Sequence, residues 1–150
     1  YLPDVGNPLT EKLYATYLTY LDEDDFSYKV KSHVDERGSF TELFKTLNNG
    51  QFSVNVAKPG VTKGNHYHHK KNEKFIVLSG EGVIKFRHIM KDTVISVPVN
   101  GKEITVVDII PGYTHSITNT GSDDLVFFIW ASEVFDSSKP DTTFVNVEKK

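Results

Sequence analysis

The chain has 150 residues, of which 38% are hydrophobic and 25% are charged, and its formal net charge at pH 7 is -3. This composition is typical of one globular domain with an appendage, and the slight acidity gives no general attraction to nucleic acid. The absence of cysteine excludes a disulfide framework and thiolate catalysis. It also fits a reducing compartment, so we expect a cytoplasmic location. No apolar run approaches the roughly 18–20 residues that cross a membrane, and no signal peptide is visible.

Residues 1–25 differ from the rest of the chain and predict an amphipathic helix. Asn7 is placed to cap this helix, and the acidic run 22–25 is expected to end it, because negative charge is unfavourable at a helix C-terminus. Apolar side chains recur every four residues, at Leu9, Leu13, Tyr17 and Leu21. We expect this apolar side either to dock on the following domain or to belong to a preceding domain or a subunit contact.

From Phe26 onward the pattern predicts β-structure. Asn100-Gly101 lies between two apolar runs and predicts a two-residue hairpin, and 136–141 is expected to be a surface loop. The predicted strands are short runs rich in Val, Ile, Phe and Thr, at 52–57, 75–78, 82–89, 93–97, 103–110, 125–131 and 142–147. About nine short strands with almost no helix predict an all-β sandwich or barrel.

His66, His68, Glu73 and His115 together have the chemistry of a metal site. In a strand, side chains two residues apart share a face, so His66 and His68 are expected to point the same way and Tyr67 the opposite way. Three neutral imidazoles and one carboxylate suit zinc, iron, manganese, nickel or copper better than calcium or magnesium. The alternative is that these are ordinary polar residues on the surface or hydrogen-bonded within the core.

The spacing of these residues resembles the two signatures of the cupin superfamily. The pattern Gly-x5-His-x-His-x4-Glu-x6-Gly runs over residues 60–80 and agrees at every defined position. The second signature, Pro-x-Gly-x2-His-x3-Asn, is matched by Gly112, His115 and Asn119, although Pro111 is displaced by one position. The resemblance implies an all-β jelly-roll barrel around a divalent metal, for which we favour zinc. Its ligands would be His66, His68, Glu73 and His115.

Residues 35–44 carry a second resemblance. They are similar to the Asp-x-Arg-Gly-x-Phe-x-Glu-x-Phe stretch of nucleotide-sugar epimerases related to the dTDP-4-keto-6-deoxyhexose 3,5-epimerases. The resemblance implies that Arg37 contacts a diphosphate and that Phe40 and Glu42 help to hold the nucleotide. A guanidinium fork suits phosphate oxygens, and a glutamate accepts hydrogen bonds from a pyrimidine or a ribose. The alternative is a polar turn that leads into an ordinary strand.

Taken whole, the chain resembles the C-terminal cupin domain of the CapF family of capsular polysaccharide synthesis enzymes. In that family an NADPH-dependent reductase domain precedes the cupin. The resemblance implies that residues 1–25 are the helical tail of such a domain and that 26–150 form the cupin domain. The absence of an initiating Met agrees with a fragment of a longer protein. We expect no reductase activity from this chain, because it has no glycine-rich dinucleotide fingerprint.

The same resemblance implies a homodimer and an activity. The activity is C3 epimerisation of a UDP-linked 4-keto-6-deoxy-N-acetylhexosamine, on the way to UDP-N-acetyl-L-fucosamine. Such a reaction needs a base, a proton donor and positive charge at the developing oxyanion. A metal-bound imidazole cannot also carry protons, so the base is expected elsewhere. Lys63 and Tyr113 lead into the ligand segments and are the candidates we favour, ahead of Tyr67, Lys74 and Lys85.

Three other functions fit the same motifs. A cupin oxygenase would use the four ligands around iron and consume dioxygen. A metal-dependent isomerase would act on a free sugar phosphate and ignore UDP. A non-catalytic module would only bind sugar or dimerise a parent protein.

Overall fold

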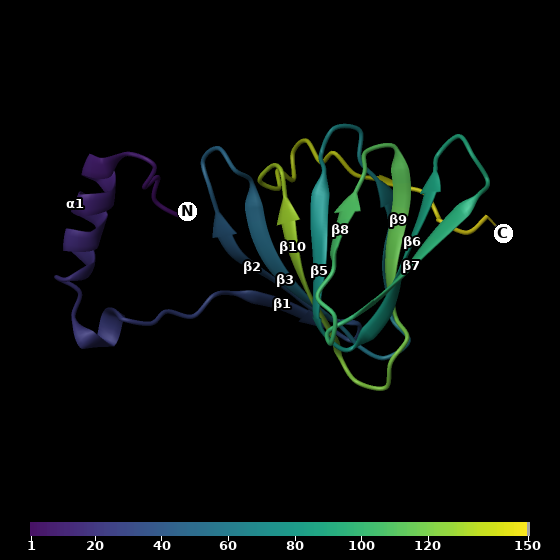
Figure 1. Ribbon diagram of the computed structural model, residues 1–150, viewed down its shortest axis with the longest axis horizontal. Coiled ribbons are helices and arrows are strands. Elements are labelled where there is room, and N and C mark those ends of the chain that lie inside the picture. The colour runs from purple at the N-terminus through teal and green to yellow at the C-terminus, as the bar shows by residue number, and fades with distance from the viewer. Residues whose placement is uncertain (150) are drawn as a thin grey trace.

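The computed structural model describes residues 1–149 as two facing antiparallel sheets with an N-terminal helix that stands apart from them (Figure 1). The sheet orders are β1-β2-β3-β10-β5-β8 and β11-β4-β9-β6-β7. The strands are β1 (Ser32–Asp35), β2 (Gly38–Lys45), β3 (Gln51–Ala57), β4 (Thr62–Tyr67), β5 (Glu73–Ser79), β6 (Glu81–His88), β7 (Val94–Asn100), β8 (Val106–Ile109), β9 (Tyr113–Asn119), β10 (Leu125–Ala131) and β11 (Thr143–Phe144). The predicted all-β jelly-roll architecture is confirmed, as two sheets that do not close into a continuous ring of strands.

Every run predicted as a strand contains one, and 136–141 is a loop as predicted. Four strands lie outside those runs: β1, β2, β4 and β9. Of these, β4 and β9 carry His66 and His115, and their glycines and polar side chains dilute the alternating apolar pattern by which a strand is recognised.

The hairpin predicted at Asn100-Gly101 is wrong. β7 pairs with β6 in one sheet and β8 pairs with β5 in the other, so this connection passes between the sheets. The Asn100 side-chain oxygen accepts hydrogen bonds from the N–H groups of Lys102 and Glu103. Gly101 N–H donates to the Gly80 carbonyl at 3.0 Å. An asparagine-centred turn therefore redirects the chain without pairing the strands on either side of it.

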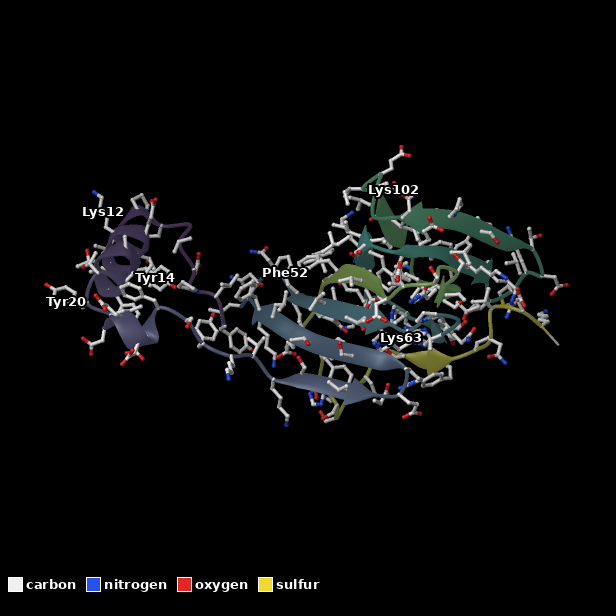
Figure 2. The ribbon with its side chains drawn as sticks, turned by 90° about the horizontal axis from the view of Figure 1, so that it is seen from below. Lys12, Tyr14, Tyr20, Phe52, Lys63 and Lys102 are labelled. Carbon is white, nitrogen blue, oxygen red and sulfur yellow. The ribbon has the colours of Figure 1, made fainter. Side chains whose placement is uncertain are left out.

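Helix α1 (Pro8–Leu18) begins as predicted, with the Asn7 side chain accepting from Leu9 N–H at 2.8 Å. It ends before Leu21, and a 3-10 turn, η1 (Glu23–Asp25), follows. No residue of α1 is buried, and Figure 2 shows Tyr14 and Tyr20 well away from the sheets. The prediction that this helix docks on the following domain is therefore wrong. Its assignment to a preceding domain stays a prediction. No helix within residues 1–149 is long and apolar enough to cross a membrane.

The core lies between the two sheets and is mostly apolar. Its buried side chains include Phe75, Val77, Ile84, Phe86, Val107, Ile109, Ile117, Leu125 and Phe127. Strand β3 is the exception, because the side chains that it buries are polar at Gln51, Ser53 and Asn55. Buried polar groups need hydrogen-bond partners. Of these three residues, Asn55 lies beside the candidate site.

Candidate metal centre

The four predicted ligands lie together between the sheets. His66 is on β4, His68 follows that strand, Glu73 begins β5 and His115 is on β9. One ligand atom from each lies within 4.8 Å of the others, and all but His66 are buried. Glu73 Oε2 is 3.3 Å from His68 Nε2 and 3.7 Å from His115 Nε2. A tetrahedral site with metal bonds of about 2.0–2.1 Å separates its ligand atoms by about 3.3–3.4 Å, so the spacing suits such an ion.

The local backbone explains why β4 and β9 meet so closely here. His66 pairs with His115 after a bulge in β4 that follows Gly64. Gly64 has φ 101°, and a Cβ on it would lie 2.7 Å from the His115 carbonyl oxygen. Only glycine combines this φ with this close approach. The bulge therefore brings the two histidines of different strands to one level.

The hydrogen bonds of His68 leave one of its ring nitrogens for a metal. His68 Nδ1 is 2.6 Å from the Asp141 carbonyl oxygen, which can only accept, so Nδ1 carries the hydrogen. Nε2 is then the ring nitrogen left to face the Glu73 carboxylate, 3.3 Å away. A proton between these two atoms, or a metal ion in its place, can bridge them. The donor set therefore fits a divalent metal.

His115 supports the same conclusion by a missing hydrogen bond. Its Nε2 is buried and has no hydrogen-bond partner, while its Nδ1 faces the Tyr113 carbonyl at 3.4 Å. A buried ring nitrogen without a partner costs folding free energy, and coordination to an ion would supply the missing partner.

The electrostatics keep three of these groups in their metal-binding forms. Burial, reinforced by the neighbouring histidines, lowers the pKa of His66 to about 4 and that of His115 to about 3. Burial alone would raise the pKa of Glu73. The hydrogen bond to His68 and the charge of Lys71 oppose it, and the pKa falls to about 2. Neutral imidazoles and an ionised carboxylate are the forms that bind metals.

Asp141 organises the site from behind the ligands, which the sequence did not indicate. Its carboxylate accepts the N–H groups of His69, Lys70 and Lys71 at 2.9, 2.9 and 2.8 Å. Desolvation opposes ionisation, but these three donors hold the pKa of Asp141 well below its usual range. Its backbone carbonyl meanwhile fixes the ring of His68. One residue of the segment before β11 thus holds both the ligand and the loop that leads to Glu73.

A cavity of about 240 Å³ opens beside the ligands, and Lys63 lies on its wall. Lys63, labelled in Figure 2, reaches from β4 to strands β2 and β3 of the other sheet. Its ammonium donates to the carbonyl oxygens of Val56 and Ser39 at 2.8 and 3.1 Å, and burial lowers its pKa. Lys71 also lines the cavity, 3.3 Å from Glu73 Oε1. The structure thus brings one of the two predicted catalytic residues to the ligands and adds Lys71.

The other predicted catalytic residue is not at the cavity. The ring of Tyr113 packs against His88 with centroids 5.1 Å apart, and it does not line the cavity. Of the other residues considered, Lys74 pairs with Asp108, and the ring of Tyr67 lies edge-on to that of His69 with centroids 5.2 Å apart. Tyr67 does not line the cavity.

A shallower groove of about 410 Å³ adjoins the cavity, and the two share wall residues that include Phe40 and Lys63. Arg37 lines this groove, and its guanidinium is paired with Asp35 at 2.7 Å. Two of the three predicted nucleotide contacts, Arg37 and Phe40, therefore lie next to the metal ligands. Glu42 does not line either space, and it pairs with Lys45 at 2.9 Å.

Comparison with known sequences identifies the family. The polysaccharide biosynthesis C-terminal domain family matches residues 33–143. The chain belongs to this family. Over 138 residues it is 51% identical to the UDP-2-acetamido-2,6-beta-L-arabino-hexul-4-ose reductase of Pseudomonas aeruginosa, which covers 92% of this chain and 37% of that relative.

Solved structures agree with this assignment. The capsular polysaccharide assembling protein CapF of Staphylococcus aureus is 54% identical with a TM-score of 0.95, and the match covers 97% of this chain and 40% of that one. This family member therefore spans about two fifths of the length of these relatives. ChmJ, a 3'-monoepimerase of Streptomyces bikiniensis, is 18% identical with a TM-score of 0.58 over 78% of this chain and 66% of its own. That likeness shows the fold alone, and the cupin character of the fold is confirmed.

Proposed function

We propose that this domain epimerises C3 of a UDP-linked 4-keto-6-deoxy-N-acetylhexosamine during synthesis of a capsular polysaccharide precursor, UDP-N-acetyl-L-fucosamine. A homologous reductase, named for a UDP-linked 4-keto sugar of this kind, and CapF support the substrate class. A reductase domain elsewhere in a parent protein would use the product with NADPH.

The observation that carries the proposal is that a cavity and an open groove adjoin each other at the ligand cluster. The cavity of about 240 Å³ is smaller than the roughly 300–1,000 Å³ of pockets that enclose a drug-sized ligand. It therefore suits a single sugar ring. The adjoining groove is open and contains Arg37 and Phe40, which suit a diphosphate and a base. A UDP-sugar with its ring beside the ligands and its nucleotide in the groove would occupy both.

Lys63 is the residue we favour for moving the proton at C3. In its neutral form the amine keeps both hydrogen bonds to Val56 and Ser39 and still has one lone pair for the substrate. In its charged form the same position offers an N–H. Burial lowers the pKa of Lys63, which raises the share of the neutral form above that of an exposed lysine. Lys63 can therefore take the proton from one face of C3, and a proton donor on the opposite face would complete the inversion.

A divalent metal, when bound, would act as a Lewis acid that stabilises negative charge on the ketone oxygen. Around it, Glu73 and the three histidines would hold the ion, and Lys71 would keep the second oxygen of Glu73 occupied. The surrounding aromatic wall, which includes Phe40, Phe75 and Phe127, would exclude water from the reacting carbon.

Proton exchange monitored by NMR tests the proposal. The protein is incubated with the UDP-4-keto sugar in deuterium oxide without NADPH, and deuterium is expected at C3. His66→Ala and a chelated sample, checked for folding, tell whether the metal is needed for exchange or only for structure. No exchange by folded, zinc-loaded protein would refute the proposed activity. Oxygen consumption by an iron-loaded sample would instead support a cupin oxygenase.

A nucleotide titration tests the groove independently of turnover. Arg37→Ala is expected to weaken binding of UDP, because a guanidinium that suits the diphosphate is lost. Lys74→Ala is the matched control, since Lys74 is an exposed lysine paired with Asp108 outside the groove. Absence of UDP binding by the unmodified chain would favour an isomerase of free sugar phosphates or a non-catalytic module.

The predicted homodimer is part of the proposal. The outward side of β3 and β10 carries apolar side chains that are only partly covered, including Phe52 and Phe128 with ring centroids 5.8 Å apart. Such a surface suits burial against a second copy. Sedimentation velocity is expected to give a dimer, and a monomer across the accessible concentrations would refute it.

A further inference from the structure

Two buried side-chain atoms among the described residues have no hydrogen-bond partner, and both belong to residues that line the same cavity. One is His115 Nε2, which the metal centre explains. The other is Asn55 Nδ2, on a side chain that is 6% exposed and carries no ligand pattern. A buried N–H without a partner destabilises the folded state. A bound ligand would supply the hydrogen-bond acceptor that Asn55 Nδ2 lacks.

The fold satisfies comparable amides elsewhere. Asn119 is buried to 1% exposure, and its Nδ2 donates to the carbonyls of Ala57 and Asp123 while its Oδ1 accepts from Gly121 N–H. Asn119 was identified from the second cupin signature, and its hydrogen bonds hold strand ends together rather than reaching the metal ligands. The contrast separates a structural amide from Asn55, which lines the cavity and has a donor without a partner.

The surroundings of Asn55 define what the partner is. Asn55 lies on β3 opposite Phe40 of β2 and Phe127 of β10, which form apolar walls. Lys63 donates to the carbonyls of Ser39 and of the next residue, Val56, so one position on its nitrogen remains, and the proposed function uses that position for the C3 proton. The N–H of Asn55 without a partner, flanked by aromatic rings, favours an acceptor oxygen with developing negative charge.

We propose that Asn55 contacts the substrate and donates its Nδ2–H to the carbonyl oxygen of the keto sugar held in the cavity beside His66 and His115. This inference rests on the proposed function, which supplies the 4-keto sugar. Asn55 lines both the cavity and the groove that contains Arg37. We favour the carbonyl over the diphosphate, because the guanidinium of Arg37 already suits the phosphate oxygens. As C3 loses its proton, the C3–H electrons move into the C3–C4 bond and the carbonyl pair moves onto the oxygen. Asn55 holds that oxygen in both states and more strongly in the charged one.

Asn55→Leu tests this assignment with an apolar side chain of similar shape. Deuterium exchange at C3 is expected to fall about 100-fold in kcat, the loss seen when one oxyanion donor is removed. The melting temperature is expected to stay level or rise, because an unsatisfied amide is removed. Zinc affinity is expected to stay unchanged. Asn119→Leu is the contrasting variant, and its melting temperature is expected to fall, since three hydrogen bonds are lost.

Asn55→Asp is a second variant that keeps the size of the side chain and removes the donor. Exchange at the unmodified rate by either Asn55 variant overturns the inference and leaves the proposed function intact. A clear fall in the melting temperature of Asn55→Leu also overturns it, by showing a structural role. If the unmodified protein exchanges nothing, the proposed function fails. The Kd of Asn55→Leu for the keto sugar then tests the contact. An unchanged Kd overturns it. A raised Kd for the keto sugar, with no change for its 4-hydroxy analogue, supports it.

Discussion

Lowering the pH from 7 to 5 should affect zinc binding at this site far less than at an ordinary three-histidine site. An imidazole of pKa about 6.5 must give up a proton at pH 5, which costs about 2 kcal/mol relative to pH 7. Three such groups would weaken zinc binding by about 6 kcal/mol, or roughly 10⁴-fold. With pKa values of about 4 and 3, His66 and His115 are already neutral at pH 5 and together add less than about 0.1 kcal/mol. The fall in affinity should therefore stay well short of the roughly 10⁴-fold expected for three ordinary imidazoles.

Competition with a calibrated chromophoric chelator at both pH values measures this change. Calorimetry in two buffers of different ionisation enthalpy counts the protons released on binding, and clearly fewer than three are expected at pH 5. A fall in affinity near 10⁴-fold, or release of about three protons, would show that the imidazoles of the metal-free protein are charged. The explanation based on burial would then be refuted.

The other predictions concern stability and support of the ligands. The metal-free protein should lose stability as the pH falls from about 6.5 to about 4, because the folded pKa values of His66 and His115 lie below the unfolded value and the unfolded chain binds more protons. Urea unfolding should show a slope approaching about 2.7 kcal/mol per pH unit, and a flat profile would contradict it. Asp141→Ala should weaken zinc binding about 10- to 100-fold, whereas Asp136→Ala in the same loop should not, as chelator competition will show. Gly64→Ala should cost about 2–4 kcal/mol in urea unfolding, because φ and space both exclude a Cβ, and a loss below about 0.5 kcal/mol would refute this.

The ligand set could be predicted from sequence because metal coordination depends on spacing that survives without structural detail. His66 and His68 share a strand-like spacing, and the later ligands sit at fixed distances in two recognisable signatures. The structure confirms that these residues come together. The apolar runs likewise predict strands, because alternation reports which face is buried.

The pairing of those strands could not be predicted in the same way. Asn100-Gly101 is compatible both with a hairpin and with a turn that crosses between sheets, and only the partners available in space distinguish them. The apolar stripe of α1 was equally ambiguous, because amphipathic spacing shows that a helix has an apolar side without showing what covers it.

By itself the sequence determined the fold class and the metal ligands, because periodicity and signature spacing are local properties of a chain. The tertiary structure alone decided which other side chains reach the site. Asp141 lies 73 residues beyond His68 and still bonds its ring, and Lys63 crosses from one sheet to the carbonyls of the other. Asn55 has no sequence signal at all, since a missing hydrogen bond exists only once every potential partner has been placed.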